Sequence, residues 1–306
     1  MKWKWIFGII ALQVLSGCDQ KKTTSTTDAA KGKLDLVVVN YPLKYFAERI
    51  GGDQVEVQFL APGDTDPAYW TPDDETVTAF QQADMILLNG AGYAQWFNKV
   101  TLPPSKLINT TFSVQDKYIE MSEQATHTHG PEGKHAHSEL AFTTWLDPGL
   151  AIAQADAIRK ALSKELPGKS GYFNARFLSL AGDLQKIDSA IVALTTQVQD
   201  EPLIFSHPIY QYFEKHYALH GKSVHWEPNQ FPDRVMLKDL EEILIEHPAE
   251  WMVWESEPLT QTIDKLKEYG IGIIVFDPSG NTPVKGDYIS VMEQNIHNLQ
   301  MAFSTQ

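Results

Sequence analysis

Short apolar runs alternate along the first part of the chain with segments whose apolar residues recur at helical spacing. The apolar runs at residues 34–40, 55–63 and 84–92 predict buried strands. Residues 43–52 and 73–83 predict helices; the first ends at glycines and the second begins with acidic residues. Strands that alternate with helices predict a parallel sheet with helices on its faces.

The same alternation returns in the last third of the chain. The predicted strands there are residues 202–206, 222–227, 250–255 and 271–278, and the predicted helices are residues 210–219, 234–247, 259–270 and 288–303. Both halves therefore have the same predicted architecture. The predicted fold class is α/β, with two β/α domains whose sheets are mostly parallel.

A long helical region separates the two halves. Helices are predicted at residues 150–162 and 172–198, and the second would be roughly 40 Å long if unbroken. The predicted division is an N-terminal β/α domain at 34–166, a rigid connecting helix at 167–199 and a C-terminal β/α domain at 200–306. Open β/α sheets bind ligands beyond the C-terminal ends of their strands, so we expect a ligand cleft between the domains.

The N-terminus has the layout of a secretory signal. Residues 1–17 carry two early lysines and then an apolar run that is too short to span a bilayer. The sequence "LSGC" is similar to a bacterial lipobox, which implies cleavage before Cys18, the single cysteine, and a lipid on it. Residues 18–33 are polar and Thr-rich and predict a flexible tether. We expect an extracytoplasmic protein anchored to a bacterial membrane, on the periplasmic face of the inner membrane in a Gram-negative cell.

Composition and charge narrow the classes of partner. The chain has 306 residues, 43% of them hydrophobic, which suffices for two modest cores. Its formal net charge is −14, which argues against nucleic acid and anionic lipid as main partners and suits attraction of cations. The chain lacks the Gly-x-Ser-x-Gly, phosphate-loop and His-Glu-x-x-His motifs, so no enzymatic activity is expected.

A histidine-rich segment interrupts the N-terminal domain. Residues 124–138 form a predicted loop that holds two His-x-His pairs: His127, His129, His135 and His137. Alternate side chains of an extended segment share one face, so each pair can chelate a metal ion. The competing interpretation is a solvated polar insert in which the histidines are incidental.

Six segments, in order, carry a resemblance to a known family. They are "NYPLKYFAERIGGDQVEVQFLAPGDTDPAYWTP", "ADMILLNGAGYAQWFNKV", "TTWLDPGLA", "FSHPIYQYFEKHYAL", "WMVWESEPLT" and "IIVFDPSG". Together they resemble the zinc/manganese-binding solute-binding lipoproteins of metal ABC transporters. The resemblance implies a monomer that captures a divalent metal, zinc first and manganese second, as cargo. It also implies a membrane permease as partner.

The resemblance also implies four metal-ligand positions, of which two are degenerate here. The two positions in the N-terminal domain are Ala68 and Thr143, neither of which suits zinc. The two positions in the C-terminal domain keep His207 and Asp277.

Three hypotheses about ligand binding remain open at this point. Acidic neighbours could rebuild a metal site for a harder cation; the candidates are Asp66, Asp73, Asp74 and Glu75. Alternatively, the same fold binds a non-metal small ligand through aromatic side chains. The candidate lining residues are Tyr41, Tyr69, Trp70, Trp226 and Glu227, with Phe231 a weaker addition, whereas Trp145 and Trp254 are expected in the core. Lastly, an accessory lipoprotein could trap metal through the histidine-rich loop alone.

Overall fold

A computed structural model of the chain describes all residues except 3–31, 64, 122–139, 197, 199 and 304–306. The predicted signal peptide, Cys18, most of the tether and the four histidines of the loop therefore lie outside the described residues. Contacts divide the chain into two units, Met1–Gly32 and Lys33–Gln306. The fold described below is that of the second unit.

The N-terminal lobe is built on a four-stranded parallel sheet in the order β2-β1-β3-β4. Its strands are β1 (Leu34–Val38), β2 (Val55–Phe59), β3 (Met85–Leu88) and β4 (Leu107–Asn109). The helices α1 (Tyr41–Gly51) and α2 (Asp74–Gln82) begin at capping side chains, because Asn40 accepts from the Leu43 amide and Asp73 from the Thr76 amide. The central strand β1 is apolar and buried almost throughout, as expected of a strand covered on both faces.

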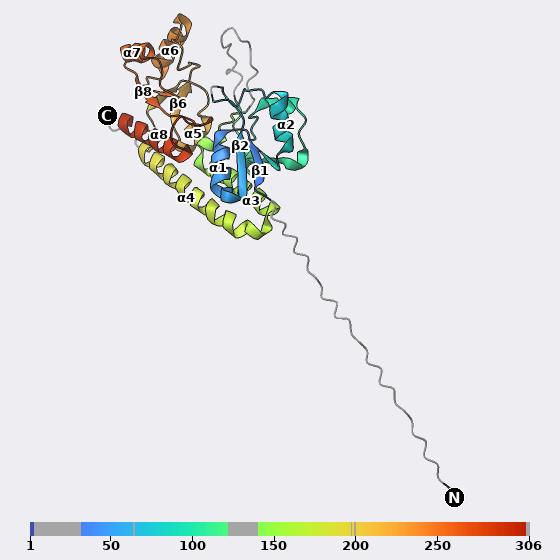
Figure 1. The fold of residues 1–306 in the computed structure, drawn as a ribbon. Helices are drawn as coiled ribbons and strands as arrows, with labels where there is room; N and C mark the ends of the chain where they lie inside the picture. The colour runs from blue at the N-terminus through green and yellow to red at the C-terminus, as the bar shows by residue number, and fades with distance from the viewer. Residues whose placement is uncertain (3–31, 64, 122–139, 197, 199, 304–306) are drawn as a thin grey trace. The chain divides into compact units, whose positions relative to one another are not determined.

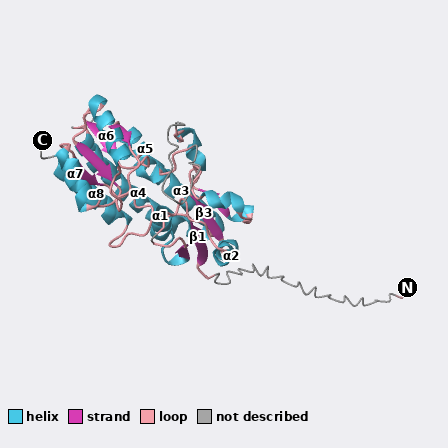
Figure 2. Ribbon diagram, turned by 90° about the horizontal axis from the view of Figure 1, so that it is seen from above, coloured by secondary structure: helices cyan, strands magenta, loops and turns pink. Residues whose placement is uncertain are grey.

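The C-terminal lobe repeats this plan with a parallel sheet in the order β6-β5-β7-β8. Its strands are β5 (Pro202–Phe205), β6 (His220–Ser223), β7 (Trp251–Trp254) and β8 (Gly272–Val275), and its helices are α5 (Gln211–Tyr217), α6 (Arg234–Glu246), α7 (Thr260–Glu268) and α8 (Tyr288–Phe303). Figure 2 shows the strands of both lobes flanked by helices. The α/β class with two parallel sheets is therefore confirmed.

Two long helices connect the sheets. Helix α3 (Pro148–Glu165) packs along α4 (Ser170–Thr195), which is the long helix predicted from the sequence. Helix α4 contacts α1 of the N-terminal lobe and α8 and α5 of the C-terminal lobe (Figure 1). Because one continuous helix packs against both lobes, it restricts their relative motion.

The lobes also share one hydrophobic core. The ring of Tyr288 on α8 lies 5.7 Å from the Tyr45 ring and 5.3 Å from the Phe46 ring on α1, measured between centroids. The Trp145 indole of the N-terminal lobe donates a 2.7 Å hydrogen bond to the carbonyl of Pro278 in the C-terminal lobe. A second, separate core lies inside the C-terminal lobe around Trp254. Opening the cleft widely would expose part of the shared core, so we expect only limited closure and opening.

The structure differs from the sequence pattern at two strands. Strand β4 was not predicted, because its three residues are too short to give a periodic signal. Strand β6 begins at His220, two residues before the predicted start, and ends at Ser223. Residues 224–227 therefore follow the strand and lie at its C-terminal end, where ligands bind in such sheets.

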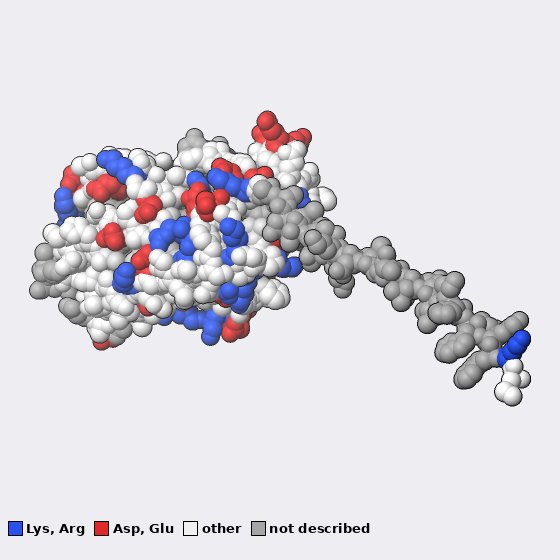
Figure 3. All heavy atoms as spheres, turned by 60° about the horizontal axis from the view of Figure 1, so that its bottom comes forward, with Lys and Arg blue, Asp and Glu red and all other residues white. Residues whose placement is uncertain are grey.

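The distribution of surface charge agrees with the expectation that nucleic acid is not a main partner. On the face drawn in Figure 3, acidic and basic side chains of the described residues are interspersed, and neither sign forms a broad field. That face offers no basic footprint for nucleic acid. Within the described part of the chain, every helix is too short or too polar to cross a bilayer.

Candidate metal-binding cleft

A cavity of about 730 Å³ lies between the two lobes. Its walls include Thr65, Asp66, Tyr69, Tyr93, Phe142 and Thr143 from the N-terminal lobe and His207, His225, Glu227, Glu255, Asp277 and Asn281 from the C-terminal lobe. Most of the aromatic rings come from the N-terminal lobe, and most of the ionisable groups come from the C-terminal lobe. The cavity is therefore apolar on one side and charged on the other.

Three ionisable side chains converge in this cavity. The Nε2 atom of His207 lies 3.2 Å from Oε1 of Glu227, and its Nδ1 atom lies 3.9 Å from Oε1 of Glu255. One potential ligand atom from each residue can be chosen so that all three lie within 4.8 Å of one another. One imidazole and two carboxylates at this spacing can bind a divalent cation.

The sheet topology explains why these residues meet. His207 comes shortly after β5, Glu227 after β6, Glu255 directly after β7 and Asp277 shortly after β8. All four strands are parallel, so their C-terminal ends share one edge of the sheet, and that edge faces the cleft. Asp277 lines the same cavity, and its carboxylate accepts a hydrogen bond from the Ser279 amide.

Burial and neighbouring charges shift the pKa values of the ionisable groups in the cavity. It lowers the pKa of His207, but the hydrogen bond to Glu227 and the charges of Glu255, Glu227 and Asp66 outweigh it, so the pKa is raised overall. Burial raises the pKa of Glu255, of Asp66 and of Asp277. Several acids that line one cavity together with an imidazole attract a cation, because a bound metal replaces the protons that otherwise relieve their repulsion.

The two degenerate ligand positions have structural roles instead. Ala68 is 2% exposed, is part of the shared core, and its amide donates to the Asp66 carboxylate. Thr143 lines the cavity, but its hydroxyl donates a hydrogen bond to the carbonyl of Ile209 across the lobe boundary. Asp66 is the acidic neighbour that the structure places in the cavity wall. The other three acidic candidates, Asp73, Asp74 and Glu75, lie at the start of α2 and do not line the cavity.

The structure places the candidate aromatic residues in different environments. Tyr69 is 40% exposed, lines the cavity and lies edge-on to Phe142. Three others pack elsewhere and do not line it: Tyr41 is 7% exposed in the shared core, Trp70 packs on Trp96, and Trp226 packs on Trp254. Phe231, also 40% exposed, is absent from the cavity wall too. The prediction was wrong for these four, because proximity to a cleft loop does not fix the direction in which a side chain points.

Two potential metal ligands of the cavity wall, Glu255 and His225, had not been singled out from the sequence. Glu255 follows the predicted strand of residues 250–255, so its place at a strand end was the available signal. His225 is separated from Glu227 by one residue, and alternate residues of an extended segment share a face. The strand was predicted as far as Glu227, yet its histidine was not connected with the cleft.

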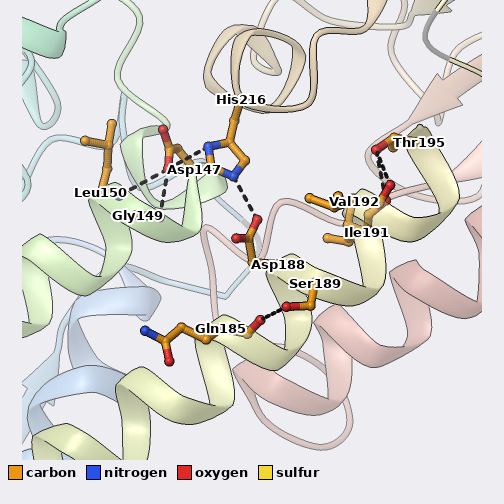
Figure 4. Close-up of polar contacts among 10 residues, drawn as sticks. All are labelled: Asp147, Gly149, Leu150, Gln185, Asp188, Ser189, Ile191, Val192, Thr195 and His216. Carbon is orange, nitrogen blue, oxygen red and sulfur yellow. Dashed lines mark hydrogen bonds and ion pairs between the residues drawn. The ribbon is translucent and has the colours of Figure 1, made fainter.

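A charged joint formed by His216, Asp147 and Asp188 connects α5 with the start of α3 and with α4 (Figure 4). His216 on α5 lies between two carboxylates: its Nδ1 atom is 3.2 Å from Asp147, and its Nε2 atom is 2.8 Å from Asp188 on α4. Asp147 also caps α3 by accepting from the amides of Gly149 and Leu150. The hydrogen bond to Asp147 is the main cause that raises the pKa of His216 to about 9, so the imidazole is charged at neutral pH.

We expect this joint to make stability fall at alkaline pH. Because the folded pKa of His216 lies above its ordinary value of about 6.5, its stabilising effect is fully present below about pH 6.5 and is lost as pH rises through about 9. The effect should be on the order of 2 kcal/mol after allowance for solvent screening of the partly exposed ring. Urea unfolding between pH 6 and pH 10 measures it.

The matched controls for the joint are Asp188→Asn and His216→Gln. His216→Gln should remove the fall in stability between pH 6.5 and pH 9, because it removes the titrating group. Asp188→Asn should reduce the fall, because it removes one of the two carboxylates that raise the pKa of His216. An alkaline slope that stays unchanged in both variants would assign the effect to other groups.

Comparisons with known proteins identify the family of the chain. The model of the family described as "Zinc-uptake complex component A periplasmic" matches residues 36–302. The zinc-binding lipoprotein AdcA of Streptococcus pneumoniae R6 is 27% identical over 290 residues, covering 90% of this chain and 57% of AdcA. The chain thus spans just over half the length of that relative. The metal ABC transporter substrate-binding lipoprotein SloC of Streptococcus mutans is 27% identical over 231 residues, covering 72% of this chain and 69% of SloC.

A solved structure supports the same assignment at the level of fold. The Zn(II)-bound ZnuA-like domain of Streptococcus pneumoniae AdcA superposes with a TM-score of 0.75 at 24% identity, covering 89% of this chain and 99% of that domain. The family match extends over most of the chain, through both sheets and the helix that joins them. The chain therefore belongs to the periplasmic zinc-uptake component A family.

Proposed function

We propose that this protein captures a divalent metal ion, zinc first and manganese second, in the cleft between its lobes and passes it to the membrane permease of an ABC importer. The observation that carries the proposal is the convergence of His207, Glu227 and Glu255, whose ligand atoms lie within 4.8 Å of one another. The relatives AdcA and SloC support it, since one is a zinc-binding lipoprotein and the other a substrate-binding lipoprotein of a metal ABC transporter.

The ligand chemistry suits such a cargo. Zinc binds imidazole nitrogen and carboxylate oxygen at about 2.0–2.2 Å in sites of three or four ligands. His207, Glu227 and Glu255 would supply three of these ligands, and Asp277 lies in the same cavity wall. Zinc also exceeds manganese in affinity for a given set of nitrogen and oxygen ligands. The protein performs no chemistry on the metal: it binds, closes to a limited extent and releases.

The anchoring and the histidine-rich loop belong to the same proposal. A lipid on Cys18 would hold the protein at the outer face of a bacterial membrane, beside its permease. The loop with His127, His129, His135 and His137 would collect zinc weakly and rapidly near the cleft. A neutral organic ligand suits the cavity less well, because it offers no positive charge to the carboxylates of Glu227, Glu255 and Asp277 in the cavity wall.

A competition titration with a zinc-chelating dye tests the proposal. We would replace the four loop histidines by asparagine in the lipid-free mature chain, so that only the cleft can bind tightly. One zinc ion per chain should still bind, and the double change Glu227→Gln and Glu255→Gln should abolish that binding while the circular dichroism spectrum stays the same. If the chain with the substituted loop binds no zinc, the cleft is not the metal site.

A further inference from the structure

The segment that follows β6 presents two side chains to the cavity in alternation. The Val224 amide donates a 2.8 Å hydrogen bond to the Phe205 carbonyl, and the Trp226 amide donates one of the same length to the Ser206 carbonyl. The strand-like pairing with β5 thus continues past the end of β6. Val224 and Trp226 are 7% and 2% exposed in the core of the C-terminal lobe. The intervening His225 and the following Glu227 therefore point the other way, and both line the cavity.

His225 lies beside the imidazole that is already in the group. The ring centroids of His207 and His225 are 6.4 Å apart, and the rings are nearly perpendicular, at 78°. Two imidazoles that bind one tetrahedral zinc ion at the usual bond length have centroids about 5 Å apart. The rings need to approach by roughly 1.5 Å, which a side-chain rotation can provide. The two rings are therefore neighbours in the cavity wall, a short movement away from the separation of two zinc ligands.

We propose that the metal site is complete within the C-terminal lobe, with His225 as its second nitrogen ligand beside His207, Glu227 and Glu255. The proposal rests on the proposed function and specifies its ligand set. Two imidazoles and two carboxylates give a four-ligand zinc site, and every member follows a strand of one sheet. His225 would supply a ligand nitrogen, which Ala68 and Thr143 at the two degenerate positions cannot supply.

This arrangement gives the N-terminal lobe a different role. Tyr69, Tyr93 and Phe142 form an apolar wall over the charged group, and such a wall excludes water and strengthens the ion's electrostatic attraction to its ligands. Among the charged groups that the structure describes in the cavity wall, only Asp66 comes from that lobe. The metal ligands should then come from the C-terminal lobe alone, and changes in the N-terminal wall should leave the ligand set intact.

Zinc titration and copper spectroscopy together test the ligand set in the chain with the substituted loop. His225→Ala should weaken zinc binding by at least about 100-fold, since changing groups that only position a ligand already costs roughly 10–100-fold. The matched control is His220→Ala, an exposed histidine on the same lobe outside the cavity wall, and it should bind zinc like the parent. With Cu²⁺ in the cleft, pulsed electron paramagnetic resonance should count two imidazoles in the parent and one in His225→Ala.

The possible outcomes separate the two proposals. If His207→Ala and Glu255→Gln weaken zinc binding while His225→Ala does not, the cleft binds metal but the assignment of His225 is wrong. A count of one imidazole in the parent protein overturns the assignment as well. A large loss of zinc affinity in Asp66→Asn would show that the N-terminal lobe supplies a ligand. That result would contradict a site confined to the C-terminal lobe. If His207→Ala and Glu255→Gln have no effect either, the proposed function itself fails.

Discussion

Replacing His207 with alanine should lower the zinc affinity of the cleft by at least about 100-fold, because changes to groups that only hold a ligand in place already cost roughly 10–100-fold. His207 contacts both carboxylates of the group, at 3.2 Å from Glu227 and 3.9 Å from Glu255. In His207→Ala, the carboxylates of Glu227 and Glu255 lie close together and no imidazole separates them. Their repulsion would separate them or leave them protonated, and either change competes with metal binding.

The measurement is the zinc dissociation constant from dye competition in the chain with the substituted loop. His297→Ala is a suitable control, because this histidine lies on the exposed side of α8 and outside the cavity wall. It should leave the affinity unchanged. An unchanged affinity in His207→Ala would show that the group around it does not hold the metal.

Replacing Trp145 with alanine should reduce the free energy of unfolding by about 3–5 kcal/mol, the usual cost of removing a large buried aromatic side chain. Trp145 is 2% exposed, and its ring lies 5.7 Å from the Tyr93 ring between centroids. Its indole donates to the Pro278 carbonyl, and its own carbonyl accepts from the Tyr288 hydroxyl. The change therefore opens a void in the shared core and removes one bond between the lobes.

Urea unfolding followed by circular dichroism measures this loss. Trp145→Phe keeps an aromatic ring but lacks the donor, so it should cost about 1–3 kcal/mol, mostly from the unsatisfied carbonyl. Phe112→Ala is the surface control, since that ring is 71% exposed and should change stability by less than about 0.5 kcal/mol. A loss below about 1 kcal/mol for Trp145→Ala would mean that the two lobes do not depend on their shared core.

The fold could be predicted almost completely from the sequence pattern. The last helix has the predicted bounds of residues 288–303, and α4 differs from its prediction by two or three residues at each end. Periodicity succeeded because buried strands in parallel sheets are continuous apolar runs, and amphipathic helices repeat their apolar positions. It failed at β4, whose three residues are recognisable as a strand only through their pairing with β3.

The candidate site could be predicted only in part. Loop motifs pointed to His207 and Asp277, and the structure places both in the cavity wall. Glu255 and His225 carry no local motif, because their role depends on which strand ends the sheet brings together. For Trp226 and His225, which are neighbours in the chain, pairing with β5 decides which one is buried and which one faces the cleft.

The sequence alone determined that this chain is an α/β protein with two parallel sheets and a long connecting helix, because these features are local patterns. Only the tertiary structure decided that the ionisable groups collect in the C-terminal half of the cleft. Their convergence depends on the order of strands in a sheet and on the alternation of side chains after β6. These contacts join residues that are 20 to 48 positions apart in the chain, from His207 to Glu227 and to Glu255, and no local pattern encodes them.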